Sequence, residues 1–336
     1  MLQITYEAFA RKRKELQDYV GNLKSRTDFT VFRDEWRGVE IEAKESRAGA
    51  EDGSVNHREY KSLVLYALNA TSVIYDGKLR MDGIADIDFL YPYRYVRDRL
   101  SLYMTILEIK TALKHIENID ILMLDGSIYA DLLAPRELYS LNMESRNKIL
   151  SYLPDIERSS NEIISKKIAR EDRLGNEEIF FLEYLEYLYS ISALLEKGIK
   201  KVVGISKTST DARVGYEIPD MAGFGEISSK EGFSKIYEKT VTRNFPVYSN
   251  FFKSMVFSRF YSRLEDKKQV LMFEVPREIT EKDAEHILER VKYFSIDGYP
   301  YLLRKAHREV VIGAKNIDSF ASMIGITEKT GREALK

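Results

Sequence analysis

The sequence contains no cysteine and only three glutamines in 336 residues. Without cysteine the chain cannot form a disulfide, a thiolate zinc site or a cysteine nucleophile. The absence is typical of proteins from a reducing compartment, so we expect a cytoplasmic location. The scarcity of glutamine, together with plentiful lysine, arginine and glutamate, favours a thermophilic source.

The sequence also lacks an excess of either charge and any long apolar run. Its 52 basic and 53 acidic side chains nearly cancel, so a polyanion would have to bind a local basic cluster. No stretch of 18 apolar residues occurs, and we expect no membrane association. Residues 1–24 place apolar side chains at helical spacing among charges, which predicts an amphipathic helix rather than a signal peptide.

The order of expected elements indicates a mixed α/β protein. Helices are expected at 94–118, through most of 141–198, from Pro135, at 280–294 with Thr280 as N-cap, and around His307. Strands are expected at 39–46, within 60–78, at 121–125 and 201–209, and as two or three strands within 241–276. No low-complexity linker divides the chain. We therefore predict one domain, residues 1–336, with a mixed sheet flanked by helices and a helical insertion at about 141–198.

The triplet Asp-Gly-Ser occurs twice, at residues 52–54 and 125–127. Its simplest use is a solvated turn. The second triplet, however, follows the buried run 121–124, and ligands in open α/β sheets bind at the carboxyl ends of such strands. Gly126 would let the backbone approach closely, and Ser127 could cap a following helix. Both aspartates are therefore candidate ligands.

Glu108 lies in an otherwise apolar part of the expected helix 94–118. It shares a helical stripe with Met104 and Ala112. It could face solvent beside Lys110. If it is buried instead, its carboxylate needs a cation or must take up a proton.

A divalent cation would relieve the repulsion among these acidic side chains, with water completing its coordination. His307 could be a satisfied core histidine or a further ligand, and an imidazole among carboxylates suits Mn²⁺ as well as Mg²⁺. The candidate metal ligands are Asp52, Glu108, Asp125 and His307.

The order of these motifs resembles the NurA nuclease family of archaea and some bacteria. The resemblance covers about residues 35–315 and rests on the two Asp-Gly-Ser triplets, Glu108, VVGISKTS at 202–209 and GYPYLLRKAH at 298–307. It implies an RNase H-like core, a homodimeric ring, and Mn²⁺-dependent 5′ to 3′ exonuclease and single-strand endonuclease activities. It also implies partnership with a hexameric HerA-type ATPase translocase in DNA end resection.

The resemblance assigns roles to individual residues. It implies that Asp52 and Asp125 are metal-binding aspartates, Glu108 the helix glutamate and His307 the late histidine, and that Lys207 faces a phosphate. Two features depart from the family pattern. Residues 48–51, AGAE, are less apolar than the expected strand, and Asp131 follows Asp125 by six positions, too far to be an adjacent ligand on one strand.

These residues predict phosphodiester hydrolysis with two cations, bridged by Asp52 or Asp125. Lys207 would offset phosphate charge, while Tyr299 and Tyr301 would contact single- or double-stranded DNA ends. Further basic clusters that could bind DNA or simply be solvated are Lys197, Lys200 and Lys201, and Lys253, Arg259 and Arg263.

Two other functions compete with nuclease activity. A dehalogenase-like phosphatase needs a nucleophilic aspartate two residues before its Asp-Gly, where this chain has Met123, so we discard it. A non-catalytic DNA-repair factor that docks a translocase would keep the fold but bind no Mn²⁺. The sequence has no GxxxxGK[ST] motif, so any ATP-driven movement requires a separate motor.

Overall fold

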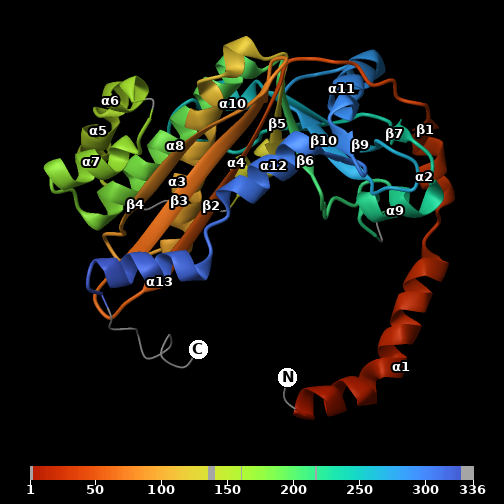
Figure 1. Ribbon diagram of the computed structural model, residues 1–336, viewed down its shortest axis with the longest axis horizontal. Helices are drawn as coiled ribbons and strands as arrows, with labels where there is room; N and C mark the ends of the chain where they lie inside the picture. The colour runs from red at the N-terminus through yellow and green to blue at the C-terminus, as the bar shows by residue number, and fades with distance from the viewer. Residues whose placement is uncertain (1–2, 135–140, 160, 216–217, 327–336) are drawn as a thin grey trace.

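The computed structural model describes residues 3–134, 141–159, 161–215 and 218–326. Within these residues ten strands form one mixed sheet in the order β1-β7-β9-β10-β6-β5-β2-β3-β4, with β8 paired to β9 (Figure 1). The strands are β1 Trp36–Gly38, β2 Ala48–Glu59, β3 Val64–Tyr75, β4 Leu79–Phe89, β5 Ile121–Asp125, β6 Val202–Ser206, β7 Gly232–Ser234, β8 Tyr237–Thr240, β9 Val256–Arg263 and β10 Leu271–Val275. A separate hairpin joins β11 Ser295–Ile296 to β12 Tyr299–Pro300.

The centre of the sheet has RNase H-like topology. Strands β2, β3 and β4 form an antiparallel meander, β5 lies parallel beside β2, and β6 lies parallel beside β5. Counted along the chain, these five strands have the spatial order 3-2-1-4-5, which is that of RNase H. The expected fold class, a mixed sheet flanked by helices, is confirmed.

Helices cover both faces of this sheet. They are α1 Gln3–Arg26, α2 Thr30–Glu35, α3 Val96–Leu113, α4 Ile128–Leu133, α5 Met143–Leu150, α6 Leu153–Arg158, α7 Ile164–Glu171, α8 Asn176–Gly198, α9 Asp220–Ile227, α10 Ser249–Lys253, α11 Glu281–Tyr293, α12 Tyr301–Val310 and α13 Ala314–Met323, with a 3-10 turn at Ile116–Asn118. None of the helices in the described ranges is long and apolar enough to cross a membrane.

Alternate residues of β5 pack against opposite helix layers, as the pleat of a strand requires. Leu122 and Leu124 belong to the core shared with α3 and α8. Ile121 and Met123 belong to the core shared with α11 and α12. The sheet thus has an α3 side and an α12 side, and the position of a residue along its strand decides which side its side chain occupies.

Buried ion pairs join α3 to α8, the last and longest helix of the predicted insertion. Lys110 Nζ lies 2.6 Å from Glu186 Oε1, and Arg99 Nη2 lies 2.7 Å from Glu183 Oε1. Helices α5 to α8 form their own apolar cluster, which confirms that 141–198 is mostly helical. Lys110 is therefore committed to α8 and does not neutralise Glu108.

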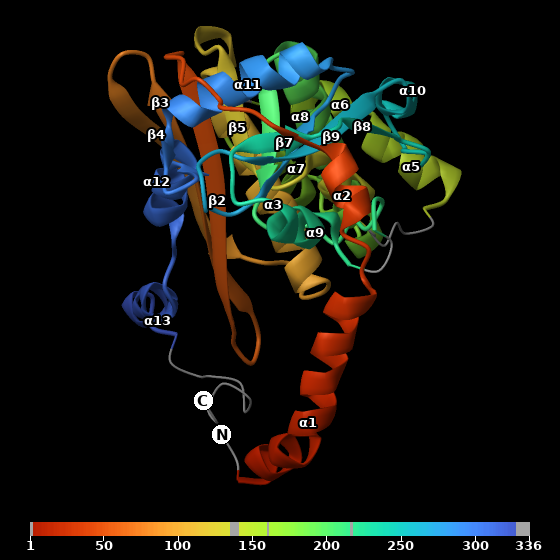
Figure 2. The same ribbon diagram turned by 90° about the vertical axis from the view of Figure 1, so that its right-hand side faces the viewer.

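Several expected elements are confirmed by the structure. Helix α1 extends from the body (Figure 2), α3 fills most of 94–118, and Thr280 caps α11 by accepting from the backbone N–H of Asp283. Region 241–276 contains β9 and β10, but also the short helix α10. The helix expected from Pro135 begins outside the described residues.

The prediction of a strand at 39–46 is wrong. That segment has no regular structure; Ile41 is buried in the core, and the partly buried Val39 packs against it. The strand begins instead at Ala48, in the segment that looked too small and polar. Its small residues suit close packing: a Cβ at Gly49 would lie 2.9 Å from Ile119 Cδ1.

Candidate metal centre

The two Asp-Gly-Ser triplets lie side by side on adjacent parallel strands. The register pairs Glu51 of β2 with Leu124 of β5, so Asp52 and Asp125 are neighbours one residue further along. Asp125 ends β5, whereas β2 continues past Asp52, and the chain after β5 diverges from it. The first triplet is therefore not a turn, as its simplest use would suggest, but the middle of a long strand.

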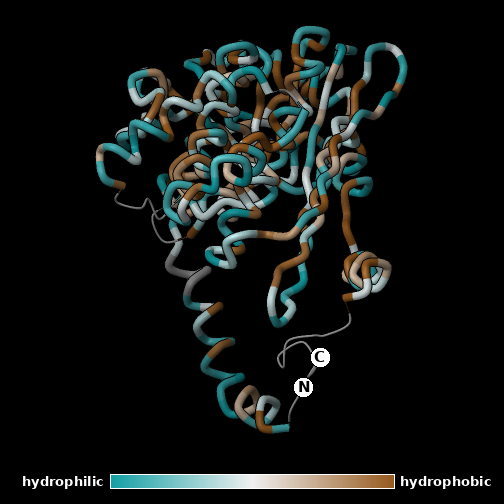
Figure 3. The backbone as a smooth tube through the Cα atoms, turned by 90° about the vertical axis from the view of Figure 1, so that its left-hand side faces the viewer, coloured by the Kyte–Doolittle hydropathy of each residue, from teal (hydrophilic) through white to brown (hydrophobic). Residues whose placement is uncertain are grey.

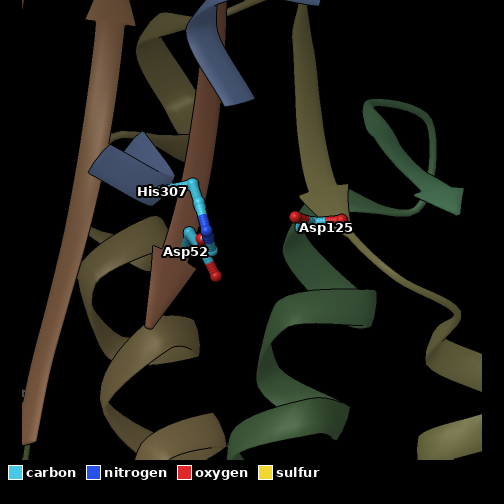
Figure 4. A group of neighbouring side chains, drawn as sticks. All are labelled: Asp52, Asp125 and His307. Atoms are coloured by element: carbon cyan, nitrogen blue, oxygen red, sulfur yellow. The ribbon is translucent and has the colours of Figure 1, made fainter. Parts of the chain in front are cut away.

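His307 approaches Asp52 from α12, which packs on β2, β3 and β5 through its apolar face. His307 Nδ1 lies 2.7 Å from Asp52 Oδ2 (Figure 4). Its side chain is 58% exposed, so it is not a core histidine. One ligand atom from each of Asp52, Asp125 and His307 lies within 4.8 Å of the other two.

These separations fit a shared cation. Ligand atoms about 2.1 Å from one octahedral ion lie roughly 3 to 4 Å apart, so small side-chain rotations would close the site. The pKa of Asp52 is raised by burial and by the charge of Asp125, although the hydrogen bond with His307 opposes this. The site therefore favours an added positive charge.

Lys207 forms an ion pair with Asp125. It follows the end of β6, and its Nζ lies 2.7 Å from Asp125 Oδ2. The same ammonium lies 4.8 Å from the centre of the Tyr299 ring. A cation bound by Asp125 would have to compete with Lys207.

Tyr299 and Tyr301 differ in their access to solvent. The Tyr299 side chain is 5% exposed beneath Lys207, so its ring has little free face on which a base could stack. Burial and the charges of Asp125 and Asp52 raise its pKa. Tyr301 begins α12 and is 37% exposed. Of the two tyrosines, only Tyr301 presents an accessible ring.

The loop after Asp125 is held by a buried polar network. Ser127 caps α4 by accepting from the backbone N–H of Ala130, and its hydroxyl donates to Glu274 Oε2 at 2.7 Å. Arg259 donates to Ser127 and pairs with Glu274 at 2.6 Å. Gly126 adopts a φ of +124°, which favours glycine. These contacts fix the direction in which Asp125 leaves β5.

The same network corrects one expected DNA-binding cluster. Arg259 and Arg263 lie on the central strand β9 and are 3% and 5% exposed. Arg259 is paired with Glu274 and Asp211, and Arg263 donates to backbone carbonyls. With Lys253 they do not form a basic surface, because neither guanidinium reaches solvent.

Glu108 lies on the α3 side of β2, facing Gly53. A Cβ at Gly53 would lie 2.2 Å from Glu108 Oε1, so only glycine lets this carboxylate approach the strand so closely. Burial, followed by repulsion from Asp52, Asp131 and Asp125, raises the pKa of Glu108 to about 8. Glu108 therefore does not face solvent beside Lys110.

Glu51 is a site residue that the sequence analysis missed. It precedes Asp52 on β2, so it points to the α3 side, where Glu108 lies. Its side chain is 6% exposed, and burial together with the charges of Glu108, Asp52 and Asp125 raises its pKa well above the ordinary value. The alternation of side chains along a strand would indicate the position of Glu51, but the sequence pattern predicts no strand at 48–51.

A cavity of about 310 Å³ connects these groups. Its acidic lining residues are Glu51, Asp52, Glu108, Asp125 and Asp131. Asp131 enters from α4 and accepts a hydrogen bond from the Tyr187 hydroxyl at 2.7 Å. Hard divalent cations prefer such oxygen ligands, and with His307 nearby the donor set fits Mn²⁺ or Mg²⁺.

Fold and site together define an RNase H-like domain with a cluster of carboxylates and an imidazole, at the end of a parallel strand, that could hold a cation. A family model described as the NurA domain matches residues 47–312, which span every candidate ligand. The chain belongs to the NurA family.

Individual relatives agree with this assignment. The chain is 26% identical to "DNA double-strand break repair nuclease NurA" of Sulfurisphaera tokodaii, over 98% of this chain and 97% of that protein. Its fold is similar to the crystal structure of the NurA nuclease from Sulfolobus solfataricus, with a TM-score of 0.80 and 23% identity over 97% of each chain. It is also similar to a crystal structure of NurA bound to dAMP and manganese, with a TM-score of 0.72 and 20% identity over 100% of each.

Proposed function

We propose that this chain is a Mn²⁺-dependent deoxyribonuclease that processes DNA ends in double-strand break repair. The observation that carries the proposal is the convergence of Asp52, Asp125 and His307 from three distant segments of a NurA domain. A relative named as a break-repair nuclease and a similar fold solved with dAMP and manganese support the substrate and the metal. A cytoplasmic location accords with this role.

In the proposed mechanism, Asp52, Asp125 and His307 would hold one cation, and Glu108 would contribute to a second. The chemistry that divalent cations would supply here is an activated water, stabilisation of the charge on the phosphate and assistance to the departing 3′ oxygen. The finer activities, 5′ to 3′ exonuclease and single-strand endonuclease, rest on the family resemblance.

Lys207 changes partner in this mechanism. Its ammonium pairs with Asp125, and a cation bound at Asp125 would release it. Tyr299 lies beneath the ammonium and would keep it at the site, where it can offset phosphate charge. Tyr301, with its accessible ring at the start of α12, would contact a nucleotide base.

Cleavage of labelled single- and double-stranded DNA in Mn²⁺, Mg²⁺ or EDTA tests the proposal. We expect the unaltered chain to cleave DNA with Mn²⁺ and not with EDTA, and we expect no cleavage by Asp52→Asn. Glu42→Gln, on the exposed segment before β2, is the matched control and should keep full activity. The rival function, a non-catalytic assembly factor, predicts no cleavage and no Mn²⁺ binding by the unaltered chain.

We also propose that the protein works as a homodimer with a hexameric HerA-type translocase. Exposed apolar side chains support an interface on α1, which stands away from the body (Figure 3), and on the outer face of β4. These side chains are Ile4, Tyr6, Phe9, Leu16, Tyr19 and Val20 on α1, and Leu79, Met81, Ile87 and Phe89 on β4. The translocase rests on the resemblance.

Light scattering on the purified chain tests the homodimer. We expect a mass of two chains, and Phe9→Glu combined with Tyr19→Glu should reduce it to one. A monomer in the unaltered protein would contradict the homodimer without affecting the cleavage assay.

A further inference from the structure

Glu51 differs from other buried glutamates of the described structure because it has no positively charged partner. Glu183, Glu186 and Glu274 each pair with a buried arginine or lysine. By contrast, Glu51 Oε2 is inaccessible to solvent and has no hydrogen-bond partner in the described ranges. A buried acidic oxygen without a partner carries a substantial desolvation cost, so its retention points to a ligand.

The surroundings of Glu51 identify the chemistry of that ligand. Glu51 and Glu108 both lie on the α3 side of β2 and both line the 310 Å³ cavity. Gly53, the next residue of β2 on that side, makes room for the Glu108 carboxylate directly over the strand. The nearest lysine on α3, Lys110, is held by Glu186. Among the described residues that line the cavity there is no lysine, arginine or histidine.

The cavity is large enough for a hydrated ion. Water occupies about 30 Å³ per molecule in the liquid, so the cavity has space for a cation and several waters. Mg²⁺ and ions of similar size typically keep several waters and bind through one or two carboxylates. Two glutamates that line one cavity match that pattern.

We propose that Glu51 is a ligand of a second divalent cation, which it holds together with Glu108 on the α3 side of β2. Asp52 and Asp125 line the same cavity as Glu51 and Glu108, so the second ion would lie next to the Asp52, Asp125 and His307 centre. The inference rests on the proposed metal-dependent function and deepens it, because it names the residues that hold the second ion. Neither the family resemblance nor the expected ligand set includes Glu51.

Counting bound Mn²⁺ by equilibrium dialysis of metal-free protein tests this site without measuring activity. We expect two Mn²⁺ per chain for the unaltered protein and one for Glu51→Gln, which keeps the size of the side chain and removes its charge. Glu108→Gln should lose the same ion and provides a second variant if Glu51→Gln does not fold. Glu42→Gln, the control, should bind two.

The outcomes separate this inference from the proposed function. The Glu51 site is overturned if Glu51→Gln binds two Mn²⁺ with unaltered affinity. It is also overturned if the unaltered chain binds one Mn²⁺ and Glu51→Gln binds that ion equally well. In both cases the Asp52 centre stands. If the unaltered chain binds no Mn²⁺, the proposed function itself is contradicted. Loss of one ion in both Glu51→Gln and Glu108→Gln, with the other retained, supports the second site.

Discussion

Glu108 should make the metal-free protein less stable as the pH rises, and Glu108→Gln should reduce that dependence, leaving the part due to Glu51 and Asp52. The pKa of Glu108 rises from 4.5 to about 8 because of burial and the nearby charge of Asp52. The folded state therefore keeps its proton to a higher pH than the unfolded state does. Hence the free energy of unfolding falls as the pH increases from about 4.5 to about 8.

The size of this effect follows from the two pKa values. A difference between 4.5 and about 8 corresponds to roughly 3 to 5 kcal/mol once the group is fully ionised. Glutamine keeps the shape of the side chain and carries no charge. Relative to the unaltered chain, Glu108→Gln should thus gain little at pH 4 and roughly 3 kcal/mol or more at pH 9.

Guanidinium chloride unfolding in EDTA at pH 4, 7 and 9 measures this difference. Glu42→Gln, an exposed position, is the matched control and should follow the unaltered chain at every pH. Equal pH slopes for the unaltered chain and Glu108→Gln would refute the reasoning. Saturating Mn²⁺ should reverse the order of stability, because the cation binds the ionised carboxylate of the unaltered chain.

Three further perturbations separate the parts of the site. Lys207→Met should raise Mn²⁺ affinity by up to about fivefold in calorimetry, because the ammonium no longer competes for Asp125. The same variant should lower kcat on the order of 10²-fold, because the phosphate charge is no longer offset. Unchanged Mn²⁺ affinity and an unchanged rate would contradict this role of Lys207. Gly53→Ala should weaken Mn²⁺ binding in calorimetry, because its Cβ displaces the Glu108 carboxylate at the end of a flexible side chain. Unchanged Mn²⁺ affinity would refute the close approach. Arg99→Met should lower the free energy of unfolding by about 3 to 5 kcal/mol, because the Glu183 carboxylate is left buried and unpaired. The folded variant should keep its Mn²⁺ affinity. Equal stability of the variant and the unaltered chain would show that the ion pair is unimportant.

Local patterns predicted the helices and the buried strand β5 well. The uninterrupted apolar repeat of 94–118 and the capping box at Thr280 are signals that a short segment carries by itself. Strand β2 carries no such signal, because residues 48–54 are small or acidic. They form a strand because β3 and β5 pair with them on both sides, which a single segment does not reveal.

The candidate site was predicted in part for a similar reason. Repetition of Asp-Gly-Ser and an acidic residue in an apolar helix identified Asp52, Asp125 and Glu108, and the structure brings them to one cavity. Glu51 is not predicted from the sequence, because the side of the sheet that it faces depends on the register of strand β2, which the local pattern does not indicate. The pairing of Lys207 with Asp125 depends on β6 lying beside β5, a contact between residues 82 positions apart.

Anomalous scattering from crystals soaked in Mn²⁺ tests the central claim most directly. The account predicts a manganese peak within about 2.3 Å of carboxylate oxygens of Asp52 and Asp125 and a ring nitrogen of His307, with the Lys207 ammonium moved away from Asp125. A map with no peak at these three side chains, from crystals of protein that cleaves DNA in the same Mn²⁺ concentration, would contradict it.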